Sequence, residues 1–153
     1  MITNMIEAFG VMFAHDGKDI ITSDGKVSRD WDFPKSDWSD FIIAYNKVMV
    51  TVGTGHPVMV IEGDPEPSIR QTTAVVSDTG DPLIAKHLCM HRGIVFAGNT
   101  VEDAGTPYVN RLRWSAPQEP ENFAAFGAGN YQSFENIGSY DEEIMRLVPL
   151  GND

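Results

Sequence analysis

Apolar residues along this chain occur in short runs that are rich in valine, isoleucine and aromatic side chains. The runs end at glycine, proline, asparagine or aspartate, which is the pattern of β-strands separated by tight turns. Residues 48–52 carry valine at every second position, so the valines lie on one face of a strand. Residues 41–45 form a similar run immediately before, and Asn46-Lys47 between the two runs predicts a hairpin turn.

The same pattern predicts strands along most of the chain and very little helix. Further strands are predicted at residues 9–14, 19–22, 58–61, 71–77, 83–91, 94–97 and 108–115, with a last one at 144–148. Residues 62–68 and 98–107 are predicted loops, and only residues 141–147 have a spacing that would support a helical turn or two. The expectation is an all-β fold of roughly nine to eleven short antiparallel strands.

Strand–turn–strand meanders recur at a period of roughly 40–50 residues, which is typical of the four-stranded blades of β-propellers. We expect a single β domain over residues 1–153, with about three propeller-blade-like units or a partial propeller. Its parts are N-terminal hairpins at 1–40, blade-like units at 41–77 and 83–115, and an irregular acidic segment at 116–153.

The charge balance narrows the classes of partner. Eleven Lys and Arg against 22 Asp and Glu give a net charge of −11. Such a chain is unsuited to gripping nucleic-acid phosphates or an anionic membrane surface. Cys89 is the one cysteine, so no intrachain disulfide forms. The first ten residues lack the basic region of a signal peptide, and we expect a soluble protein made in a reducing cytoplasm.

His87, Cys89 and His91 alternate along one predicted strand, so their side chains share a face, and imidazole and thiolate suit zinc. A structural zinc site takes a fourth ligand from a second cluster, and the sequence has none. We therefore predict no metal and no cofactor, and interpret these residues as a half-exposed strand face opposite Leu88 and Met90.

Nothing in the sequence predicts a catalytic centre. Cys89 lies inside a strand-like run, away from the helix N-terminus or basic setting that activates a thiol. The many acidic pairs are typical of a solvated surface, and there is no Gly-x-Ser-x-Gly motif. We predict that the protein is not an enzyme.

Residues 108–115 separate two sets of side chains by alternation. Leu112 and Trp114 share one face, which we expect to belong to the core of a sheet, and Arg111 and Arg113 share the other. Two arginines on one face could hold a phosphate, but the acidic surplus favours ion pairs with a neighbouring strand or subunit. Four glycines are expected at turns: Gly53, Gly55, Gly93 and Gly98.

Three segments together resemble part of a known family. They are residues 92–100 (RGIVFAGNT), 110–115 (NRLRWS) and 119–123 (EPENF). In this order they are similar to the propeller-bearing tail tube, nozzle or hub proteins of short-tailed bacteriophages and related prophage proteins. The resemblance extends over about residues 38–152, and its preceding hairpin is Thr51–Val60. Those proteins are several times longer, so the chain corresponds to part of them or to a smaller relative whose ring is assembled from subunits.

The resemblance implies a structural virion protein of a phage tail or head–tail connector, made in the host cytoplasm. It would form a homo-oligomer, or assemble with other virion proteins, around a conduit whose acidic wall repels DNA. Two alternatives remain open. One is a carbohydrate- or receptor-binding β domain that uses Trp31, Trp38 and Tyr131, and the other is a β-propeller hydrolase supported only by acidic residues.

Overall fold

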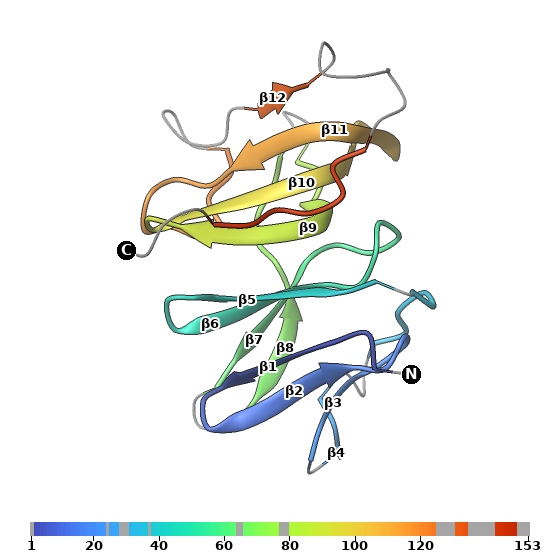
Figure 1. The fold of residues 1–153 in the computed structure, drawn as a ribbon, viewed down its shortest axis with the longest axis vertical. Coiled ribbons are helices and arrows are strands. Elements are labelled where there is room, and N and C mark those ends of the chain that lie inside the picture. Colours follow the sequence, from blue (N-terminus) through green and yellow to red (C-terminus); the bar gives the residue numbers. More distant parts are fainter. Residues whose placement is uncertain are drawn as a thin grey trace.

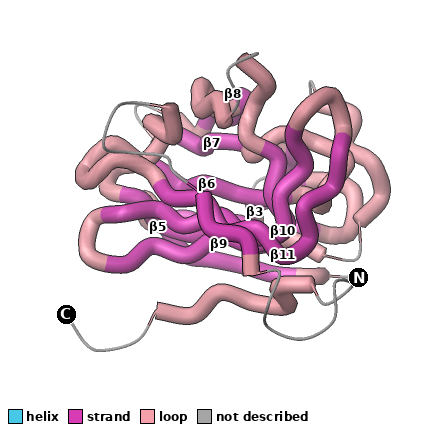
Figure 2. Tube along the Cα trace, turned by 90° about the horizontal axis from the view of Figure 1, so that it is seen from above, coloured by secondary structure: helices cyan, strands magenta, loops and turns pink. Residues whose placement is uncertain are grey.

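The protein consists of β-strands joined by short turns. The computed structural model describes residues 2–23, 25–27, 31–36, 38–63, 66–76, 80–124, 131–134 and 143–149. Over these ranges it contains twelve strands and no helix (Figure 2), which confirms the predicted all-β class. It follows that no described part of the chain forms a helix able to span a membrane.

The strands form three four-stranded antiparallel sheets, each a meander of consecutive strands. The first sheet contains β1 (Asn4–Ala8), β2 (Val11–His15), β3 (Ile20–Thr22) and β4 (Gly25–Lys26). The second contains β5 (Asp40–Ala44), β6 (Lys47–Thr51), β7 (Met59–Glu62) and β8 (Ser68–Gln71). The third contains β9 (Ile84–His91), β10 (Ile94–Glu102), β11 (Thr106–Trp114) and β12 (Tyr131–Ser133). A new unit thus begins about every 40 residues, in keeping with the predicted blade-like repeat.

The three sheets spread like a fan from their first strands. Strand β5 contacts both β1 and β9, so the first strands of the sheets lie together. From there the third sheet extends towards β12 and the first towards β4 (Figure 1), while β8 forms the edge of the second sheet opposite β5 (Figure 2). The second sheet is therefore the middle member of the stack.

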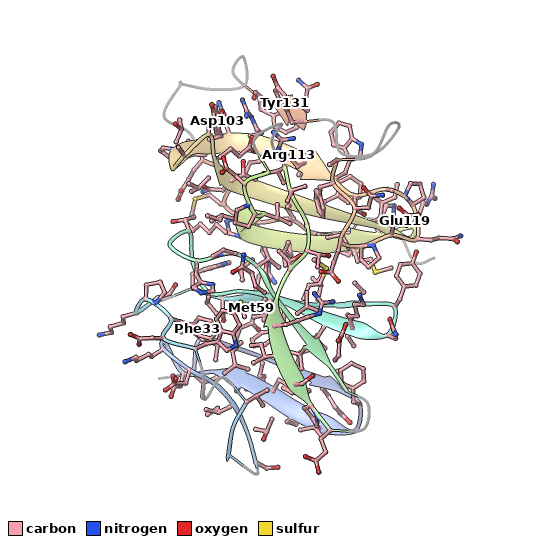
Figure 3. The ribbon with its side chains drawn as sticks, turned by 180° about the vertical axis from the view of Figure 1, so that it is seen from behind. Phe33, Met59, Asp103, Arg113, Glu119 and Tyr131 are labelled. Atoms are coloured by element: carbon pink, nitrogen blue, oxygen red, sulfur yellow. The ribbon has the colours of Figure 1, made fainter. Side chains whose placement is uncertain are left out.

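Both faces of this middle sheet are buried. Val48, Val50 and Ile61 pack towards the first sheet with Phe13 and Ile20. Phe33 and Met59 belong to the same cluster (Figure 3). The alternate residues Met49 and Val60 pack towards the third sheet. A strand covered on both faces is apolar at every position, which explains why residues 48–50 are continuously apolar.

One predicted strand and one predicted turn are displaced by one or two residues. Residues 9–10 form a turn in which Phe9 has a φ of 55°, and the strand predicted from residue 9 begins at Val11. The unpredicted β1 lies before this turn. The second-sheet hairpin turns at Tyr45-Asn46, one residue before the predicted Asn46-Lys47. Tyr45 tolerates a φ of 61° there, and its hydroxyl donates a hydrogen bond to the Gly93 carbonyl.

Parts of the predicted loops at 62–68 and 98–107 are β-strand in the structure. Strand β8 occupies 68–71, ahead of the predicted strand at 71–77, and β10 continues through 98–102 before β11 begins at Thr106. Buried polar residues in the second half of β10 gave that segment the composition of a loop. The last predicted strand, at 144–148, is extended chain outside any sheet, and residues 143–147 form no helical turn. Residues 141–142 lie outside the described residues.

Candidate functional site

The most strongly charged buried cluster of the described residues joins β10 to β11. Glu102 is 2% exposed, and it accepts hydrogen bonds from Arg111 Nη1 at 2.8 Å and from Arg113 Nε at 2.7 Å. Arg113 Nη2 also donates to Glu102, and Thr100 Oγ1 donates to it at 2.5 Å. Both arginines thus form ion pairs with an acid of the neighbouring strand, as predicted from the acidic surplus of the sequence. They are not arranged to bind a phosphate group.

This cluster holds its carboxylate in the ionised form. Burial alone would raise the pKa of Glu102, but the hydrogen bonds from Arg113 and Thr100 outweigh it and lower that pKa below its ordinary value. The Arg111 guanidinium also lies against two aromatic rings. Its central carbon is 3.5 Å from the centroid of the Tyr108 ring and 4.0 Å from that of the Tyr131 ring. Arg113 and Tyr131 are seen together at the outer end of the third sheet in Figure 3.

The prediction that Leu112 and Trp114 belong to the core of the sheet is wrong, and the arginines occupy the buried face in their place. Leu112 and Trp114 are only partly buried and are not among the buried core residues, whereas Arg111 and Arg113 are 9% and 7% exposed. Arg113 pairs with Ala97 across the ladder, on the side that packs towards the second sheet. The arginines occupy the inner face because Glu102 compensates their charge there.

Three of the four predicted turn glycines do lie at turns. Gly53 and Gly93 adopt φ values of 87° and 76°, which favour glycine, and Gly55 lies in the turn after Gly53. The prediction for Gly98 is wrong, because it lies inside β10 next to a β-bulge. A Cβ at Gly98 would approach Ile144 to 3.2 Å, so a glycine there admits the close passage of residues 143–149.

His87, Cys89 and His91 share one face of β9, opposite Leu88, as predicted from alternation. The face is more buried than expected, since His87 is fully buried and Cys89 is 6% exposed. Within the described residues no group of three or more His, Cys, Asp or Glu is placed to hold a metal ion. Burial, with a smaller contribution from Asp40, raises the pKa of the Cys89 thiol, which makes it a poor nucleophile.

His87 is the least satisfied polar side chain on this face. Neither ring nitrogen has a hydrogen-bond partner within the described part of the chain. The Asp40 carboxylate lies 4.0 Å from Nδ1 and instead accepts a hydrogen bond from the Leu88 amide, and the Trp38 ring meets the imidazole edge-on at 5.0 Å. Burial lowers the pKa of His87, and neighbouring Lys86 adds to the effect, so the ring is neutral in the folded state.

A groove of about 460 Å³, lined by both apolar and polar side chains, lies beside this histidine. Its wall combines an aromatic ring with charged and amide groups, from Trp38, Lys86, Asn99 and Glu143. The Glu143 carboxylate accepts hydrogen bonds from Lys86 Nζ at 3.1 Å and from Asn99 Nδ2 at 2.9 Å. Residues from four distant parts of the chain meet here, and no local sequence pattern connects them.

A second charged cluster, around Glu121, was not predicted from the sequence. Arg70 forms hydrogen bonds with both carboxylate oxygens of Glu121, at 2.7 and 2.9 Å, and Lys47 donates to it at 2.8 Å. Burial would raise the pKa of Glu121, but these cations and the Thr73 amide hold it well below its ordinary range. The cluster ties the loop after β11 to the second sheet, and the motif residues 119–123 gave no sign of this partner.

No family model matches the chain, and no curated protein or solved structure is similar to it at a significant level. The geometry of the described residues therefore carries the functional argument.

We expect Glu102→Gln to lower the free energy of unfolding by about 3–5 kcal/mol, because it leaves two buried arginines without their counter-charge. Urea unfolding followed by tryptophan fluorescence measures the change. Glu119→Gln, at an exposed position, is the control and should stay within about 0.5 kcal/mol of the parent protein. Equal stability of the two variants would show that the buried cluster does not hold the third sheet together.

The stability of the protein should fall as the pH is lowered from about 7 to about 5.5. Burial lowers the pKa values of His15 and His87 below 6.5, so the unfolded chain takes up protons there that the folded protein does not. Burial raises the pKa of Asp40, so the folded protein binds a proton there more readily than the unfolded chain does. This contribution stabilises the folded protein as the pH falls, and so opposes the effect of the two histidines. Melting temperatures of the parent protein and of His87→Phe test this, since the variant should show a shallower decline. An identical slope in both proteins would contradict a buried neutral His87.

Proposed function

We propose that the protein is a non-enzymatic structural component of a bacteriophage tail, in the tail tube, nozzle, hub or head–tail connector. The observation that carries the proposal is the succession of three stacked four-stranded meanders, the architecture that propeller-bearing tail proteins would require. The segments that resemble those proteins fall on its third sheet, on β10, on β11 and in the loop that follows.

The use of the charged residues supports a structural role. The two arginines of the 110–115 segment, Arg111 and Arg113, are buried and point to Glu102, so they are unavailable to DNA phosphates. The chain carries a net charge of −11, and an acidic wall repels DNA. A protein of this charge is suited to line or surround a conduit through which DNA slides without binding.

The chemistry of the buried groups also favours a scaffold. Cys89 is buried with a raised pKa, and His87 and Asp40 are 4.0 Å apart without a hydrogen bond between them. A nucleophile would need a base within hydrogen-bond reach. The groups that most resemble catalytic residues are therefore buried packing groups of the β9 region.

The proposal predicts that the chain is a stoichiometric part of the virus particle. Tryptic peptides from β9 to β11 should be found by mass spectrometry in gradient-purified virions from cells producing the phage that carries this gene. A replication protein of the same phage serves as the control and should be absent from the particles. Recovery of the chain only in the soluble fraction, with particles free of it, would contradict the proposal.

One observation favours a second function, carbohydrate binding. Trp31 is stacked on Phe33, and Tyr131 lies over the Arg111 guanidinium, so both rings pack against other side chains. Trp38 differs, because it is the ring of the three that lines the groove, together with Asn99 and Glu143. An aromatic face beside amide and carboxylate groups offers both apolar contact and hydrogen bonds to a sugar ring.

If the groove binds glycans, Trp38→Ala should lower the affinity measured on a glycan array at least tenfold relative to the parent protein. A tenfold loss of affinity corresponds to about 1.4 kcal/mol of binding free energy. Trp31→Ala, at a ring outside the groove, should retain binding. An array without signal for the parent protein would leave the structural role as the remaining candidate.

A further inference from the structure

The fan of sheets has two end faces that no other sheet covers within the part of the chain that the structure describes. On the first sheet, Ile6 and Ala8 face the second sheet, so the alternate residues Met5 and Glu7 face outward. Pairing across the ladder places Met12 on the same side. We call Met5, Glu7, Met12, Ala14 and Ile21 the first end face. Met5 and Met12 are 59% and 45% exposed, unusual for long apolar side chains side by side.

The third sheet has the corresponding outward face at the other end of the stack, partly covered by residues 143–149. Leu88, Val95 and Ala97 pack towards the second sheet, so the alternate positions face away from it. We call Cys89, His91, Phe96, Leu112 and Trp114 the second end face. Residues 143–149 cross this side near Gly98. They leave a hollow of about 310 Å³ against Phe96 and Leu112, at whose rim Val148 is 62% exposed.

We propose that a second copy of the chain closes this stack, with the first end face of each copy packed on the second end face of the other. The inference goes beyond the proposed function and would hold equally for a glycan-binding protein. Within one chain, each buried sheet interface joins one face of a meander to the opposite face of the next. The two end faces are the remaining pair of this kind, so a second copy continues an interface that the chain already contains.

Charge and symmetry agree with this occupant. The first end face carries an exposed carboxylate, Glu7, while the exposed Arg146 lies beside Cys89 of the second end face. Opposite charges therefore meet when the faces stack. Two copies related by a two-fold axis make this contact twice and leave no apolar end face, which gives a closed assembly of six meanders.

The test is the mass of the full chain by sedimentation velocity and light scattering across a wide concentration range, for the parent and three variants. Met12→Glu alters the first end face and Val148→Glu the second. Ile43→Glu, at a residue that is 47% exposed on β5 and belongs to neither face, is the control. Circular dichroism and melting temperature establish that each variant is folded, and Met5→Glu replaces Met12→Glu if that variant is not.

We expect the parent and Ile43→Glu to be dimers and each end-face variant to be a monomer. A mixture of Met12→Glu and Val148→Glu should form mixed dimers, because one of its two interfaces then joins unaltered faces. A monomeric parent, a parent larger than a dimer, or dimers unaffected by either end-face change would overturn the inference. So would a mixture that stays monomeric, since this indicates a contact of one face with itself. None of these outcomes bears on the presence of the chain in virions.

Discussion

The structure depends on apolar packing on both faces of the second sheet. Strand β6 is buried at every position after Lys47, and alternate side chains enter different cores. Because neighbouring residues of a strand face opposite sides, the register of this one hairpin determines both sheet interfaces together. A shift by one residue would exchange the Val48 set with the Met49 set and disturb both cores. The first and third sheets thus take their positions from the second.

Two buried carboxylates, Glu102 and Glu121, form ion pairs that connect segments outside the apolar cores. Glu102 joins the two central strands of the third sheet, β10 and β11, through two arginines, and Glu121 joins the loop after β11 to Arg70 and Lys47 on the second sheet. Removing water from such groups is costly, and the cost is offset only when every hydrogen-bonding atom finds its partner. These clusters therefore favour one arrangement over its near alternatives more than they add to net stability.

The sequence predicted those parts of the fold in which burial follows a simple period. The β5–β7 meander and β9 were visible because their apolar residues alternate or run continuously. The end of β10 was not, because Asn99, Thr100 and Glu102 are polar and yet buried, and their partners lie on another strand. The sequence also indicated that the arginines pair with acids but not which acid. That choice depends on a register and a β-bulge that composition does not encode.

Contacts between distant segments are not visible in the local sequence, which explains why no sequence motif marks the candidate sites. The groove beside Trp38 draws Lys86, Asn99 and Glu143 from separate strands and from the extended segment at 143–149, so it exists only after the sheets have stacked. Residues of recognisable chemistry, such as His87, Cys89 and Arg111, are buried, and Arg111 is occupied in an ion pair with Glu102. Among the described residues, the molecule presents outward the groove and the two end faces. Under the proposed structural role, the protein would act through contact with other molecules at these surfaces, while its buried reactive groups serve the packing that supports them.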